Sequence, residues 1–137
     1  MKKLLLSFTA VLFALSLNAQ SCTPGVNFQD STFGVWPDTL VNFPQAAANV
    51  FYSADLNFRA PVNSADVDPT IVGGTIDEFT VTAVSGLPPG MTYACNISNC
   101  TYAGGDNGCA NVYGTEATQG TYDVIISITA QVTFPII

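Results

Sequence analysis

The sequence contains no histidine, and only three of its 137 residues are basic. Lys2 and Lys3 stand at the very start, so Arg59 is the one basic residue in the rest of the chain. No serine or cysteine therefore has a conventional base to activate it, and no two acidic residues are forced together as a glycosidase pair would require. We expect a protein that is not an enzyme and that needs no cofactor.

Acidic residues outnumber basic ones ten to three, which gives a formal net charge of −7. Binding to nucleic acid depends on clustered lysine and arginine, so a nucleic-acid partner is disfavoured. Adhesion to anionic lipid is disfavoured for the same reason. The partner that we expect is an extracellular protein or a glycan whose identity the sequence does not reveal.

Long apolar runs are also absent beyond the start of the chain. Residues 1–19 have the form of a signal peptide, with two lysines, an apolar run from Leu4 to Leu17 and a small residue, Ala19, at the expected cleavage site. The run is too short to span a bilayer comfortably. We therefore predict a secreted, extracellular or outer-surface protein with no membrane insertion after signal cleavage. Lipidation at Cys22 is disfavoured, because the preceding residues make a poor lipoprotein signal.

Removing 19 of the 137 residues leaves 118, which is enough for one sandwich-sized domain. Three segments alternate apolar and polar residues with the period of two that is typical of strands. They cover residues 50–60, 76–84 and 122–134, and the last is the longest. In the second, Phe79, Val81 and Ala83 should share the apolar face. Each strand has one apolar face, so we predict an all-β fold of two facing sheets.

An irregular N-terminal arm, residues 20–43, precedes the domain that we place at residues 44–137. The arm is rich in proline, glycine, aspartate and asparagine and should hold at most a short strand. Trp36 is either a hydrophobic plug beneath the arm or an exposed stacking platform for a sugar. A glycan-binding face would need further aromatic rings in line with it, and the candidates are Tyr102 and Tyr113.

An oxygen-rich loop is expected at residues 63–68. Asp66 and Asp68 within it are weak calcium candidates, because carboxylates bind calcium in extracellular modules. The alternative is that both are solvated turn residues. No other metal site is indicated.

The four cysteines are Cys22, Cys95, Cys100 and Cys109. An even number in an exported chain predicts two disulfides, and a zinc site would need all four thiolates because histidine is absent. Residues 91–95 can pair with 109–113 as a hairpin around a loop at 96–108. This arrangement favours Cys95–Cys109 with Cys22–Cys100, although four cysteines allow three pairings.

Three short motifs carry a resemblance to a known family. They are Gly-Leu-Pro-Pro-Gly-Met-Thr-Tyr at 86–93, Tyr-Gly-Thr-Glu at 113–116 and Gly-Thr-Tyr-Asp-Val at 120–124. Their order and spacing resemble the immunoglobulin-like, or cadherin-like, repeats of bacterial surface proteins, over about residues 76–132. Glu116 stands where the family usually has proline. The segment between the first two motifs, residues 94–112, is longer than usual and carries three cysteines. In this it is similar to a variant of the family found in bacterial proteins exported by the type IX route.

The resemblance implies an immunoglobulin-like β-sandwich that serves as an adhesion, spacer or accessory module. The sorting domain expected of type IX proteins is not in the sequence, so we expect a fragment or one module of a longer protein. The alternative function is a carbohydrate-binding module attached to a secreted enzyme. Fold resemblance alone does not decide between these functions.

Overall fold

The computed structural model describes residues 21–25, 33–116 and 118–136, and the predicted signal peptide lies outside them. The all-β prediction is confirmed, since all regular secondary structure of the described chain is strand apart from one helical turn. Residues 50–60 and 76–84 were expected as strands and correspond to β2 and β3. The elements are β1 (Gly34–Trp36), β2 (Phe51–Arg59), α1 (Ser64–Val67), β3 (Thr75–Ser85), β4 (Met91–Cys95), β5 (Thr101–Ala103), β6 (Asn107–Thr115) and β7 (Ile125–Thr133).

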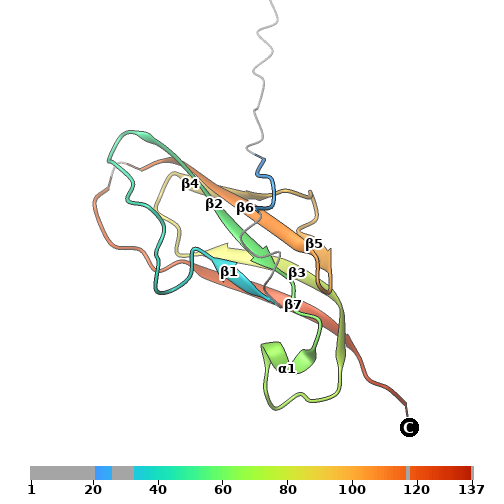
Figure 1. Cartoon of the computed structure of the whole chain (residues 1–137). Helices are drawn as coiled ribbons and strands as arrows, with labels where there is room; N and C mark the ends of the chain where they lie inside the picture. Colours follow the sequence, from blue (N-terminus) through green and yellow to red (C-terminus); the bar gives the residue numbers. More distant parts are fainter. Residues whose placement is uncertain (1–20, 26–32, 117, 137) are drawn as a thin grey trace, which may run out of the picture.

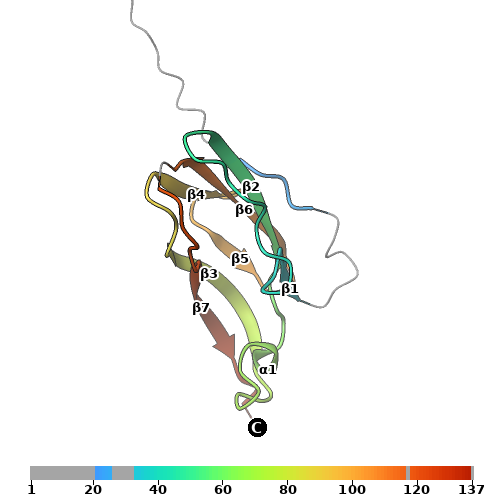
Figure 2. The ribbon, with the colours of Figure 1, turned by 90° about the vertical axis from the view of Figure 1, so that its left-hand side faces the viewer.

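Two antiparallel sheets face each other. The four-stranded sheet has the order β1-β2-β6-β4 and the three-stranded sheet the order β5-β3-β7. Figure 1 shows the layer with β2, β4 and β6 above the layer with β3 and β7, and α1 at one end of the sandwich. Figure 2 shows the same two layers from the side. The last described residues leave β7 on the side of α1.

The core lies between the sheets and is built around three aromatic rings. Phe58 of β2 contacts Phe79 of β3, with ring centroids 6.0 Å apart, and meets Tyr102 of β5 edge-on at 4.8 Å. Gly108 of β6 lies directly beside this cluster, and a Cβ atom there would come within 2.4 Å of the Phe58 ring. The absence of a side chain at Gly108 therefore makes room for the rings. The remaining buried members of the cluster are Ala60, Ile76 and Val81.

The predicted apolar face of β3 is wrong at Ala83, which is exposed. The pairing of β3 with β7 shifts register between Ile76 and Glu78 and again between Val81 and Ala83. Each shift is a β-bulge, which adds one residue to β3 and reverses the direction of the residues beyond it. Ile76 consequently enters the core, only 2% exposed, and Val84 replaces Ala83 on the core face.

The strand predicted at residues 122–134 begins later, at Ile125. Its partner β3 ends at Ser85, which pairs with Ile125. Gly86 follows with φ +76°, a conformation that favours glycine and ends the strand, and a Cβ atom there would lie 2.0 Å from the Asp123 carbonyl oxygen. Residues 122–124 therefore have no neighbouring strand with which to form a ladder.

The hairpin prediction is correct in the two strands that pair and wrong by one residue in their register. β4 does pair with β6, but Cys95 lies opposite Ala110 and Met91 opposite Gly114, one residue away from the expected partners. The connection at 96–108 is also no simple loop, because it contains β5, which joins the other sheet through β3.

Both disulfides differ from the favoured pairing. The structure joins Cys22 to Cys109 and Cys95 to Cys100, and no cysteine of the described chain is free. Opposite residues of an antiparallel pair share a face of the sheet. Cys95, opposite Ala110, therefore points into the sandwich, whereas the neighbouring Cys109 points out of it. Cys95 and Cys109 cannot bond, and Cys109 instead holds the N-terminal arm on the outer face.

The arm belongs to the sandwich more closely than its composition indicates. Gly34 to Trp36 form β1 at the edge of the four-stranded sheet, opposite Asn57 to Arg59. The expected loop at 63–68 contains the helical turn α1, and Asp66 and Val67 of this turn line the same cavity as Gly34 and Val35 of β1. No helix in the described ranges has the length and apolar character needed to cross a membrane.

Candidate ligand-binding site

A pocket lies where β1 ends beside β2. β1 pairs only with Asn57 to Arg59, so residues 51–56 of β2 have β6 on one side and no strand on the other. The chain at 37–44 runs past this open edge and leaves a cavity of about 360 Å³. We call it the Trp36 pocket, and it is lined by Trp36, Pro37, Val41, Asn42, Pro44, Ser53, Ala54, Asp55 and Asn57.

Local hydrogen bonds shape the 37–44 segment that forms one wall. The Asp38 carboxylate accepts hydrogen bonds from the backbone N–H groups of Leu40 (2.9 Å) and Val41 (2.8 Å), as aspartate commonly does in turns. Further along, the Tyr52 hydroxyl donates to the Pro44 carbonyl at 2.9 Å and ties the wall to β2. Partial burial raises the pKa of Tyr52, so its hydroxyl stays protonated to a higher pH than that of an exposed tyrosine.

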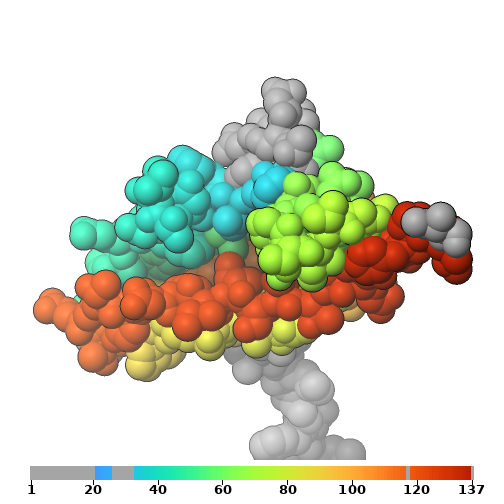
Figure 3. Space-filling view, turned by 90° about the horizontal axis from the view of Figure 1, so that it is seen from below, coloured from blue at the N-terminus to red at the C-terminus, as the bar shows by residue number. Residues whose placement is uncertain are grey.

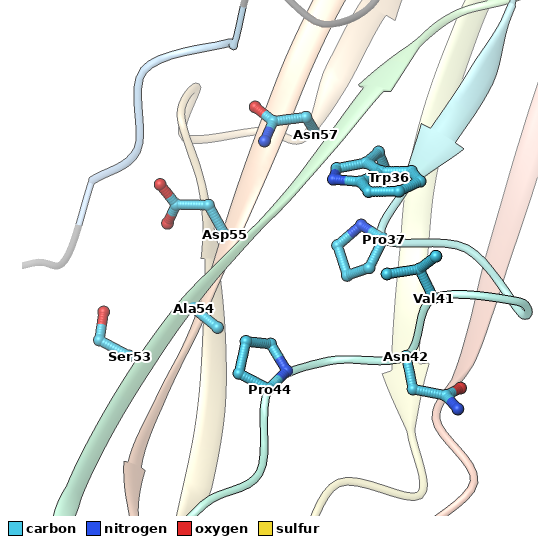
Figure 4. A pocket seen from close by; sticks show the side chains of 9 residues that line it. All are labelled: Trp36, Pro37, Val41, Asn42, Pro44, Ser53, Ala54, Asp55 and Asn57. Carbon is cyan, nitrogen blue, oxygen red and sulfur yellow. The ribbon is translucent and has the colours of Figure 1, made fainter.

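The indole of Trp36 gives the pocket its apolar surface. The side chain is 40% exposed, and it shares the outer face of the sheet with Asn57, its partner across the β1–β2 pair. Figure 4 shows the Trp36 and Pro37 rings close together on one side of β2, while Ser53, Asp55 and Asn57 project from the other. The residues that line the pocket thus include both rings and polar side chains, which lie on opposite sides of β2 in this view.

A buried asparagine fixes two of those polar side chains. Asn111 of β6 is only 4% exposed, and its Nδ2 donates to the Asp55 carboxylate at 2.6 Å and to Ser53 Oγ at 2.9 Å. Such a satisfied network holds its members in one arrangement. Asp55 is therefore presented as an oriented hydrogen-bond acceptor.

The N-terminal arm orients the third polar side chain. The backbone N–H of Gly25 donates to Asn57 Oδ1 at 2.7 Å, and the Cys22–Cys109 disulfide holds this part of the arm against the outer face. The orientation of Asn57 thus depends on a part of the arm that is covalently bonded to Cys109, 87 residues away from Cys22 in the sequence.

The three aromatic residues predicted to bind a glycan have different environments. Trp36 lines the pocket, and Tyr113 lies on the same face of the sheet, opposite Ser53. The prediction for Tyr102 is wrong, because this residue is 4% exposed in the core and its hydroxyl donates to Asn96 Oδ1 at 2.8 Å. Burial raises the pKa of Tyr102 to about 12.

The calcium candidates Asp66 and Asp68 lie in and just after α1. The Asp68 carboxylate accepts hydrogen bonds from the hydroxyl (2.7 Å) and the backbone N–H (2.9 Å) of Thr70, and these bonds lower its pKa. Asp66 Oδ2 accepts from Asn63 at 3.4 Å. Within the described residues, no group of three or more acidic, cysteine or histidine side chains gathers to hold a metal ion.

Sequence reasoning did not single out Ser53, Asp55, Asn57 or Asn111. The first three appear in the sequence only as the polar face of a strand, which most exposed strands possess. Asn111 carries no signal at all, because its burial depends on the neighbours that the sheet supplies.

No protein family, curated protein or solved structure matches this chain. The geometry of the Trp36 pocket is therefore the basis for a functional proposal.

Proposed function

We propose that this chain is a non-catalytic module of an exported protein and that it binds a neutral sugar unit of a glycan in the Trp36 pocket. The observation that carries the proposal is a half-exposed indole that lines the same pocket as the oriented side chains of Asp55 and Asn57. A sugar ring presents an apolar C–H face to an aromatic ring and hydroxyl groups to polar side chains, and this pocket offers both kinds of partner.

The charge of the chain favours a neutral ligand. The net charge is −7, and Asp55 is the only charged residue among the nine that line the pocket. An anionic sugar would be repelled by the Asp55 carboxylate, whereas a hydroxyl can donate a hydrogen bond to it.

The side chains that line the pocket are those expected of a binding module that is not an enzyme. Hydrolysis of a glycosidic bond needs two carboxyl groups flanking it, and the lining residues supply only Asp55. The absence of histidine from the whole sequence removes the commonest general base as well.

Export from the cytoplasm is supported by two features. Residues 1–19 have the signal-peptide pattern, and the two disulfides indicate an oxidising environment. The two-sheet architecture agrees with the immunoglobulin-like resemblance of residues 76–132 without identifying that family. An adhesion or accessory role in a bacterial surface protein would use the same pocket, whereas a pure spacer would not need it.

Trp36 fluorescence provides a direct test, because the chain contains a single tryptophan. The purified chain is screened against an array of neutral polysaccharides, and the best ligand is then titrated. We expect the fluorescence of the native chain to change saturably as the ligand is added. Calorimetry should show that Trp36→Ala binds the same ligand roughly tenfold more weakly or worse. An aromatic stacking partner contributes about 1–3 kcal/mol to binding in the comparable case of nucleobases.

Two further variants make the test specific. Asp55→Asn should weaken binding, whereas Phe51→Ala should not, because Phe51 is an exposed aromatic residue of the same strand outside the pocket. Failure to bind any neutral glycan, or equal binding by the native chain and Trp36→Ala, would overturn the proposal and leave the spacer function.

A further inference from the structure

The two sheets have unequal numbers of strands, and the difference leaves one long edge open. The edges formed by β1, β4 and β5 are three, five and three residues long, whereas β7, an edge of the three-stranded sheet, has nine residues. At about 3.3 Å per residue, β7 offers an edge of roughly 30 Å. Within the described chain, β7 is therefore the one long strand that pairs on a single side.

β7 lacks the features that usually protect an exposed edge. Natural edge strands avoid pairing by carrying charges, prolines or bulges, or by being short. Residues 125–133 include no charged residue and no proline, and the two bulges of this sheet lie in β3. The edge can thus accept another strand without local repulsion or distortion.

An apolar cavity opens between the sheets beside this edge. Its volume is about 350 Å³, and it is lined by both edge strands, with Val35 from β1 and Ile126 and Ile128 from β7. Val35 and Ile128 are each 40% exposed, so solvent reaches apolar side chains that a closed sandwich would bury. Figure 3 shows the β7 region running uncovered along this side of the molecule, with the 33–45 and α1 segments beside it.

We propose that β7 binds an extended segment of a different protein, which adds as the fourth strand of the three-stranded sheet. Backbone hydrogen bonds to β7 supply affinity, and every second side chain of the segment is apolar and enters the cavity under β1. The segment is neutral or basic, because the net charge of this chain is −7. This inference does not rest on glycan binding in the Trp36 pocket.

A second copy of this chain fits the edge less well than a single strand. Pairing β7 with β7 of another copy would set the two four-stranded sheets on the same side of one continuous sheet. Because β1 and β7 line the same cavity, the β1 strands of the two copies would then approach each other over the paired β7 strands. A lone segment has no such second layer.

The test uses a fluorescently labelled peptide of the length of β7, with alternating valine and threonine and a lysine at each end. Its control is the same peptide with N-methylated backbone amides, which keeps the side chains but cannot donate to a ladder. We expect saturable binding of the first peptide by fluorescence anisotropy, a rise in the melting temperature of the chain, and no binding of the second.

Two matched substitutions in β7 locate the site. Ile128→Lys places a charge at the cavity, and Ile125→Lys places the same charge on the opposite face of the same strand, where the side chain is 60% exposed. Ile128→Lys should weaken peptide binding at least about tenfold and Ile125→Lys much less, since a buried charge is far more costly than an exposed one.

Three results would overturn the inference. The first is no binding of the alternating peptide by a folded native chain. The second is equal weakening by Ile128→Lys and Ile125→Lys. The third is a native chain that sediments as a dimer and becomes monomeric in Ile128→Lys, which would make a second copy the occupant of this edge.

Discussion

Strands β6 and β7 have the same length but opposite environments. Both contain nine residues, yet residues 108–112 of β6 are all buried, whereas every residue of β7 is half-buried or exposed. Their compositions would predict the opposite burial, because β7 carries three isoleucines and β6 carries two asparagines and two glycines. Burial in this protein therefore follows the number of neighbours that a strand has, and its apolar content is a poor guide.

The neighbours of β6 come from distant parts of the sequence. β2 and β4 flank it, the aromatic cluster covers its inner face at Gly108, and the arm is bonded to its outer face at Cys109. β7 has only β3 beside it and the open cavity at its inner face. Substitutions at β6 and at β7 should therefore differ clearly in how much they lower the free energy of unfolding.

The largest effect is expected from the disulfide that anchors the arm to β6. In the chain-entropy model, a bond across 87 residues contributes about 4–5 kcal/mol and one across five residues about 2 kcal/mol. The double variant Cys22→Ala/Cys109→Ala should therefore lose more stability than Cys95→Ala/Cys100→Ala, as measured by denaturant unfolding. Equal losses would show that the arm adds little to the stability of β6.

A matched valine substitution should give a smaller difference between the strands. Val112 of β6 is 6% exposed, and Val132 of β7 is only partly buried. We expect Val112→Ala to cost about 2 kcal/mol and Val132→Ala about 1 kcal/mol in urea unfolding, because removed methyl groups cost more where the site is closed. Equal costs would mean that β7 is packed as tightly as β6.

An effect on the pH dependence of stability concerns Tyr102, whose ring lies beside Gly108 of β6. Burial raises its pKa to about 12 from the ordinary value of 10. Below pH 10 the hydroxyl is protonated in both states, and the stability from this group is fully present. Between pH 10 and about 12 only the unfolded chain loses the proton, so stability should fall as pH rises.

Unfolding measured in rapid pH jumps checks this prediction against Tyr102→Phe. The variant has no hydroxyl to titrate at this position and should keep the dependence from Tyr52, whose pKa is also raised. A native chain whose stability is unchanged between pH 10 and 12 would indicate that Tyr102 is more accessible than its 4% exposure implies.

Part of the candidate site could be predicted from sequence. Trp36 was identified because a lone tryptophan in a polar arm is conspicuous, and it does line the pocket. Tyr102 was chosen on the same basis and is in the core, because the short strand β5 carries it between the sheets. An aromatic residue looks alike in both settings until its neighbours are known.

The sequence by itself determined most of the long strands of this protein and the number of its disulfides, but not the short strand β5. Alternation with a period of two is a property of the covalent geometry of each strand, so it can be recognised locally. Only the tertiary structure decided the register of β4 against β6, the bulges in β3, the partners of the cysteines and the strand that lies at the centre. These depend on contacts between residues far apart in the chain, and a shift of one residue reverses which side chains face the core.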